Sequence, residues 1–152
     1  MNLRPVESVP SGVKKNFPPR ILIVEDDLKI RETVGHLLQM EGYEVDMASD
    51  ATEFLEKLAP LVLRSVDGAI PDAILTDIRM PGASIIAILT GLRKKGWDFP
   101  IIVFSAFGSE SMEKQLNQIG VTRFFNKPLD FQQLYEVLEL SLWRPDGVEI
   151  IQ

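Results

Sequence analysis

The sequence predicts an α/β fold in which a doubly wound parallel sheet carries helices on both faces. Short apolar runs alternate along the chain with segments whose apolar residues recur at helical spacing, five of each kind. Most of the strand-like runs are continuously apolar, which is typical of parallel strands buried on both faces. Strands that alternate with helices form such a sheet through right-handed crossovers.

The first strand and helix are indicated by a change of period near residue 24. Residues 21–24 are a continuous apolar run, and the apolar stripe that follows has helical spacing. Gly42 ends this helix, and residues 43–48 alternate enough for a second strand. The stripe consists of Ile30, Val34, Leu37 and Leu38.

The second helix begins with a capping-box pattern. Asp50 and Glu53 have the spacing at which each side chain can bond to backbone near the other. Pro60 interrupts the helical pattern, so residues 61–66 are either a kinked continuation or an irregular loop. Residues 61–71 exceed what a compact helix-to-strand connection needs, which suggests an insertion or a lengthened helix.

The second half of the chain repeats the strand–helix alternation three times. The strands are predicted at residues 73–76, 101–104 and 121–125, and the turn Met80-Pro81-Gly82 follows the first of them. Apolar stripes mark the helices between and after these strands; the last helix opens with the capping pair Asp130 and Gln133. The stripes are Ile85, Ile88, Leu89 and Leu92; Met112, Leu116 and Ile119; and Phe131, Leu134, Leu138 and Leu142.

Length, charge and composition narrow the function classes. At 152 residues the chain is about one domain, and its net charge of −6 disfavours direct binding to nucleic acid. The apolar runs are too short to span a membrane, so we expect no membrane association. The sequence has no cysteine, which fits a reducing compartment and a cytoplasmic location.

Both ends of the chain lie outside the predicted strand–helix pattern. Residues 1–18 are rich in proline and have no continuous apolar core, so we expect a flexible N-terminal extension rather than a secretory signal. Residues 144–152 are expected to be a C-terminal tail or the start of a linker. The domain itself is predicted to span residues 19–143.

Polar residues suited to phosphoryl chemistry follow the apolar runs. Glu25 and Asp26 follow the first run and Asp77 the third, and parallel strands present such ends along one edge of the sheet. Carboxylates gathered there favour Mg²⁺, which takes oxygen ligands and leaves room for a phosphoryl oxygen. Asp77 is the best candidate for a nucleophile toward phosphorus. Ser105 and Lys127 end the fourth and fifth runs and can contact phosphoryl oxygens.

Four sequence strings carry a family resemblance in the same order and spacing. ILIVEDD, ILTDIRMPG, IIVFSAF and FFNKPLD resemble the receiver domain of two-component response regulators, over roughly residues 19 to 143. The resemblance implies a flavodoxin-like sheet of five parallel strands in the order 2-1-3-4-5 with five helices. It also implies a cis Lys127–Pro128 peptide bond.

The resemblance assigns roles to individual residues. Asp77 corresponds to the phosphoacceptor, and Ser105 and Lys127 to the residues that assist it. Ser105 and the aromatic Phe124 correspond to the switch residues, although Phe124 could also be a plain core residue. The Mg²⁺ ligands implied are Glu25, Asp26, Asp77 and the backbone carbonyl of Arg79, with Asp27 only capping the first helix.

The function implied is that of a signalling module rather than an enzyme. A sensor histidine kinase or a phosphotransfer protein would donate the phosphoryl group to Asp77. Phosphorylation would then shift the face formed by the fourth helix, fifth strand and fifth helix, which a downstream protein would read. The chain would catalyse only its own phosphorylation and dephosphorylation.

Other function classes fit less well. A haloacid-dehalogenase-type phosphohydrolase needs a second aspartate two residues after the nucleophile, and position 79 is Arg. The loop after the first strand lacks the glycines of a dinucleotide site and the Gly-Lys-Ser/Thr of a P-loop. A receiver-like module that works without phosphorylation is the remaining alternative, and its site residues would be expected to have drifted.

Two residues beside the expected site belong to positions that vary within the family. The side chain of Arg79 could pair with the phosphoryl group or with Glu25, and Phe107 could exclude the hydrolytic water. We therefore expect a relatively long-lived phosphoaspartate, and loss of the acyl phosphate within seconds would contradict this expectation.

Overall fold

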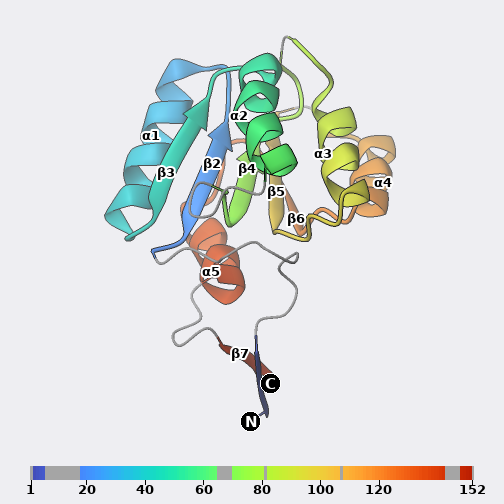
Figure 1. Ribbon diagram of the computed structural model, residues 1–152. Coiled ribbons are helices and arrows are strands. Elements are labelled where there is room, and N and C mark those ends of the chain that lie inside the picture. The colour runs from blue at the N-terminus through green and yellow to red at the C-terminus, as the bar shows by residue number, and fades with distance from the viewer. Residues whose placement is uncertain are drawn as a thin grey trace.

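A computed structural model describes residues 2–5, 18–64, 70–80, 82–106, 108–142 and 148–151. Five parallel strands form one sheet in the order β3-β2-β4-β5-β6, which is the expected order 2-1-3-4-5 (Figure 1). The elements are β2 (Arg20–Val24), α1 (Leu28–Met40), β3 (Glu44–Ala48), α2 (Ala51–Arg64), β4 (Ala73–Thr76), α3 (Ile85–Lys94), β5 (Ile101–Ser105), α4 (Glu110–Ile119), β6 (Arg123–Asn126) and α5 (Phe131–Leu142).

The alternation of side chains along the strands divides the core into two layers. In β2, Leu22 and Val24 pack on one face of the sheet, among buried residues of α2, α3 and α4. Ile21 and Ile23 point to the opposite face, which α1 and α5 cover. Because successive side chains of a strand point to opposite faces, a strand buried on both sides must be apolar throughout. This explains the unbroken apolar run that predicts β2.

The helix starts follow the expected capping residues. Asp27 Oδ1 accepts a hydrogen bond from the Ile30 N–H at 3.0 Å, and Asp130 Oδ1 accepts one from the Gln133 N–H at 3.2 Å. Asp50 accepts from the Glu53 N–H at 2.7 Å. The Glu53 carboxylate accepts from the hydroxyl of Ser49 at 3.1 Å instead of bonding back to the backbone N–H of Asp50. Among the described residues, the expected capping box is therefore only half formed.

The structure resolves the alternatives left open around Pro60. The helix α2 continues through Pro60 to Arg64, so residues 61–64 are helical rather than an irregular loop. Residues 65–69 of the suggested insertion lie outside the described part of the chain. Ile70 and Asp72 are buried where the chain enters β4, and the Asp72 carboxylate accepts the Arg20 N–H at 2.8 Å.

A second, separate sheet joins segments near the two ends of the sequence. The strands β1 (Asn2–Pro5) and β7 (Val148–Ile151) pair antiparallel, with Asn2 opposite Ile151. No local pattern in these segments signals the pairing. The flexibility of the extensions and the domain boundary at residue 19 stay predictions. Among the described residues, no helix is long and apolar enough to cross a membrane.

Candidate phosphoryl-acceptor and metal site

The site residues are held in place by backbone hydrogen bonds that continue the sheet beyond the strand ends. The Asp77 N–H donates to the carbonyl of Val24 at 3.0 Å, and the Glu25 N–H donates to the carbonyl of Ala48 at 3.1 Å. Rigid strands therefore fix both carboxylates at the carboxyl edge of the sheet, where ligands bind in open α/β folds.

Lys127 is positioned in the same way on the other side of the edge. Its N–H donates to the carbonyl of Ser105 at 3.0 Å, and the Lys127–Pro128 peptide bond is cis, as expected. Its Nζ lies 2.6 Å from Asp77 Oδ2 and 2.6 Å from Glu25 Oε1. One ammonium group thus bridges two carboxylates that follow different strands.

Burial and ion pairing have opposite effects on the pKa of Lys127, whose side chain is only 19% exposed. Burial alone would lower its pKa, but the hydrogen bonds to Asp77 and Glu25 together raise the pKa above its usual value. The Nζ also lies 5.2 Å from the ring centroid of Phe104, within cation–π range. Lys127 therefore stays protonated and presents a fixed positive charge to Asp77.

Glu25 has no exposed surface, and burial is the main reason that its pKa is raised. The hydrogen bond from Lys127 acts against that rise, whereas the contact with Asp26 adds to it. Its second oxygen accepts the Asp27 N–H at 3.3 Å. A buried carboxylate with one cationic partner and an acidic neighbour is suited to receiving a further cation.

The acidic cluster fits a hard divalent cation. Glu25, Asp26 and Asp77 each offer a carboxylate oxygen, and these three atoms lie within 4.8 Å of one another. Asp26 is exposed while the other two residues are buried, so one side of the cluster faces solvent. Mg²⁺ prefers such a site because it binds one or two carboxylates and keeps several waters.

Asp77 itself is almost fully buried, and both of its carboxylate oxygens have partners. Oδ2 accepts from Lys127, and Oδ1 accepts the Arg79 N–H at 3.0 Å. The hydroxyl of Thr76 donates to the Asp77 carbonyl at 2.7 Å, which further fixes the backbone there. Arg79 has an exposed side chain, and its expected role through the backbone carbonyl stays a prediction.

The two expected switch residues lie on adjacent strands. Ser105 ends β5, is 1% exposed, and is paired in register with Asn126 of β6. Phe124 is half-buried on β6 and packs against the core layer that α2, α3 and α4 cover. Phe107 lies outside the described residues, so its expected effect on water stays a prediction.

One residue beside the site was missed by the sequence reasoning. Arg31, in the first turn of α1, donates from Nη1 to the carbonyls of Glu25 and Asp26 at 2.8 and 3.4 Å. These bonds hold the acidic loop against the start of α1. The only signal in the sequence is a cation one turn after the acidic run, which is too common at helix surfaces to be decisive.

Comparison with known proteins agrees with this geometry. The sequence profile of the response regulator receiver domain matches residues 21–139. The chain belongs to this family. The receiver domain is 32% identical over 128 residues to the response regulator MprA of Mycobacterium sp. (strain KMS), covering 84% of this chain and 52% of that protein.

A second relative is close to this receiver domain in length. The chemotaxis protein CheY of Treponema pallidum (strain Nichols) is 31% identical over 135 residues, covering 86% of this chain and 88% of that protein. By contrast, the chain spans about half the length of the MprA proteins that it matches.

Solved structures share the fold of this receiver domain. Chemotaxis protein CheY4 of Vibrio cholerae has a TM-score of 0.68 at 28% identity, covering 82% of this chain and 98% of that one. A CheY-like receiver domain protein from Methanospirillum hungatei JF-1 has a TM-score of 0.71 at 27% identity, covering 82% and 93%.

Proposed function

We propose that this receiver domain accepts a phosphoryl group on Asp77 and acts as a Mg²⁺-dependent switch in two-component signalling. The observation that carries the proposal is the bridge of Lys127 Nζ, 2.6 Å from both Asp77 Oδ2 and Glu25 Oε1, beside a three-carboxylate cluster. A receptive carboxylate, a fixed cation and a divalent-metal site are the parts that phosphoryl transfer to a carboxylate requires.

The proposed reaction forms an acyl phosphate. An Asp77 oxygen attacks phosphorus while the bond from phosphorus to the donor group breaks, and the donor leaves with that bonding pair. Glu25 and Asp26 would hold Mg²⁺ together with Asp77, and the metal when bound would neutralise charge on the phosphoryl oxygens. Lys127, already hydrogen-bonded to Asp77, is placed to turn its ammonium toward a phosphoryl oxygen.

The phosphoryl donor and the reader of the signal belong to the same proposal. A sensor histidine kinase or a phosphotransfer protein supplies the group, and Ser105 and Phe124 report its presence to the face formed by α4, β6 and α5. Ser105 is buried at the end of β5, which leads into the segment before α4. A downstream protein binds this face. We expect the receiver domain to act in the cytoplasm.

Incubation with acetyl phosphate and Mg²⁺ followed by intact-mass measurement tests the proposal. Wild type should gain the mass of one phosphoryl group, and Asp77→Asn should gain nothing. Asp27→Asn is the matched control, because Asn also caps helices and the residue lies next to the acidic pair. This variant should be labelled like wild type.

Two results would contradict the proposal. Equal labelling of wild type and Asp77→Asn would place the reactive group elsewhere. No labelling of any variant, with the fold intact by circular dichroism, would favour an interaction module that works without phosphorylation. Release of phosphate from added phosphoesters over many turnovers would instead favour a hydrolase, which Arg79 at the position of the second aspartate argues against.

A further inference from the structure

Gly108 leaves room for the ring of Phe124. A Cβ atom on residue 108 would lie 2.5 Å from Cζ and 2.8 Å from Cε1 of Phe124. Carbon atoms that are not bonded to each other pack at about 3.5–4.0 Å, so any side chain at position 108 would overlap the ring. The ring therefore occupies space that only glycine leaves empty.

The conflict concerns this space and not the backbone conformation. The glycines with positive φ among the described residues are Gly42, Gly82, Gly96 and Gly120, so the backbone at Gly108 does not require glycine. Asn126 Oδ1, at 3.3 Å from the same Cβ position, is a milder contact. Because Cζ is the outer end of a rotatable side chain, the ring can move more cheaply than the sheet or the loop.

The ring position seen here accompanies an Asp77 carboxylate that accepts a hydrogen bond from Lys127. Gly108 lies between Ser105, at the end of β5, and Ser109, the N-cap of α4. The contact thus joins Gly108, which directly precedes the N-cap of α4, with an aromatic residue of β6. A change at position 108 would act on the ring without touching any residue of the acidic cluster.

We propose that Gly108 is a positioning residue, which permits the ring position of Phe124 that accompanies the hydrogen bond between Lys127 and Asp77, and so sets the balance of the proposed switch. This inference rests on the proposed function of Asp77. Gly108→Ala excludes the observed ring position, and under this proposal the displaced ring position is the one that a phosphoryl group on Asp77 favours. The site of this variant then accepts a phosphoryl group at a lower conformational cost.

Beryllofluoride with Mg²⁺ is the probe, because it mimics a phosphoryl group on a carboxylate without covalent turnover. Its dissociation constant should fall roughly 3- to 10-fold in Gly108→Ala, since the competent ring position is then populated before binding. Gly91→Ala is the matched control. Apart from the adjoining backbone of α3, no atom of the described residues lies within 4 Å of a Cβ at that position, so this variant should bind beryllofluoride as wild type does.

A double-mutant cycle separates the ring from the loop. Leucine lacks the outer ring atoms that approach residue 108, so Gly108→Ala should leave the affinity unchanged in a Phe124→Leu background. With ¹³C-labelled phenylalanine incorporated, which adds no atom to the ring, the aromatic resonances of Phe124 in ligand-free Gly108→Ala should move toward their positions in the wild-type beryllofluoride complex. A purely structural role would not produce that shift.

Several outcomes overturn the inference. Unchanged or weaker beryllofluoride affinity in Gly108→Ala does so, as does an equal effect of Gly108→Ala in the wild-type and Phe124→Leu backgrounds. If Gly108→Ala alone does not fold, addition of Phe124→Leu must restore folding, and failure to do so also overturns it. Lack of beryllofluoride binding to wild type would refute the proposed function instead.

Discussion

At Lys127 a single ammonium group compensates two carboxylates at 2.6 Å. Its removal would leave Glu25 and Asp77 facing each other with little water to screen them, because neither side chain is more than 8% exposed. Loss of one partner from a buried ion pair is costly because the remaining charge is uncompensated. Lys127 therefore supports the fold as well as the chemistry that we propose.

We expect Lys127→Met to lower the free energy of unfolding by about 2–4 kcal/mol without Mg²⁺, since a buried pair loses its cation. Urea denaturation measures this, and Mg²⁺ should recover part of the loss because it supplies positive charge to the same carboxylates. Lys94→Met, an exposed lysine on α3, is the control and should change stability little. A loss equal to that of the control would contradict this account.

The sequence predicted which residue types meet at the strand ends, because strand period and parallel pairing depend on local pattern. It could not predict the contacts of long side chains. Whether Arg31 turns back to the carbonyls of Glu25 and Asp26 depends on rotamers that the packed structure selects. The approach of Phe124 to Gly108 likewise depends on the path of a loop, which periodicity does not encode.

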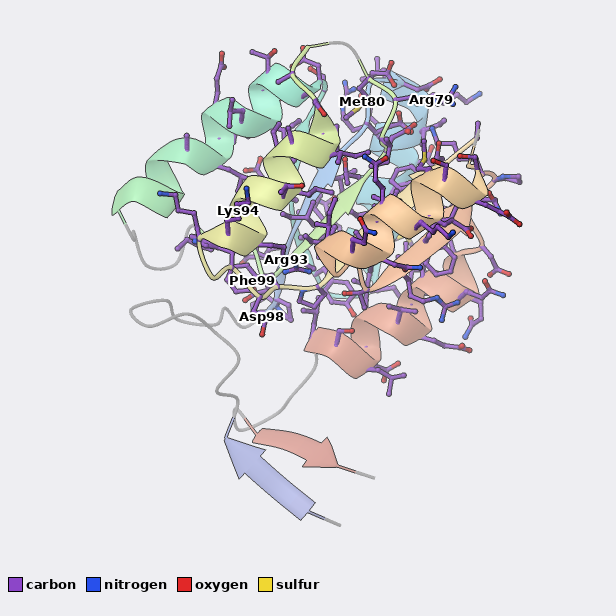
Figure 2. The ribbon with its side chains drawn as sticks, turned by 90° about the vertical axis from the view of Figure 1, so that its right-hand side faces the viewer. Arg79, Met80, Arg93, Lys94, Asp98 and Phe99 are labelled. Carbon is purple, nitrogen blue, oxygen red and sulfur yellow. The ribbon has the colours of Figure 1, made fainter. Side chains whose placement is uncertain are left out.

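At the scale of elements, Arg93 ties the end of α3 to the end of α4. Its Nη1 donates to the carbonyls of Trp97 and Phe99, each at 2.8 Å. Its Nε donates to the carbonyl of Ile119 at 3.1 Å, and its Nη2 donates to the carbonyl of Gly120 at 2.8 Å. Burial lowers the pKa of Arg93, and Asp98 opposes that shift. Figure 2 shows Arg93 and Phe99 near the C-terminal end of α3, whereas Arg79 and Met80 lie near its N-terminal end.

Arg93→Met should lower the free energy of unfolding by about 2–3 kcal/mol, because four carbonyl groups lose a charged donor and three of these hydrogen bonds are partly buried. Chemical denaturation measures the loss, and hydrogen exchange should show the amides at the end of α4 becoming less protected. Asp98→Asn, which keeps the four carbonyl bonds, should have a much smaller effect. Unaltered exchange in α4 would show that the tie does not restrain this helix.

Helix and strand positions followed from periodicity, but two features of the elements did not. The helix α2 passes through Pro60, which a local rule treats as an interruption. Tertiary packing overrides that rule, since Phe54 and Leu58 of α2 are buried in the core. The pairing of β1 with β7 joins segments at opposite ends of the sequence, and no local pattern specifies such a partner.

For the whole molecule, gathering acidic groups at one edge makes stability depend on cations. Glu25 is buried, and Asp26 and Asp77 lie close to it. A ligand that binds only the folded state raises stability by mass action. The acidic site therefore lowers stability when it is bare and raises it when a cation binds.

At a concentration ten times its dissociation constant, Mg²⁺ should raise the free energy of unfolding of wild type by about 1.4 kcal/mol. The thermal midpoint should rise accordingly. Glu25→Gln should raise the midpoint without Mg²⁺, because it removes a buried charge while Lys127 keeps Asp77 as its partner. The same variant should respond less to the metal. Calorimetry with KCl matched for ionic strength measures both effects. A larger Mg²⁺ response in Glu25→Gln than in wild type would refute the assignment of this residue as a ligand.

The ion pairs of Lys127 join residues far apart in the chain, 102 positions from Glu25 and 50 from Asp77. During synthesis from the N-terminus, the acidic residues leave the ribosome well before their counter-ion does. A nascent chain that ends before β6 has the carboxylates without the lysine. The phosphorylation that we propose should therefore become possible only after β6 has joined the sheet and brought Lys127 to the two carboxylates.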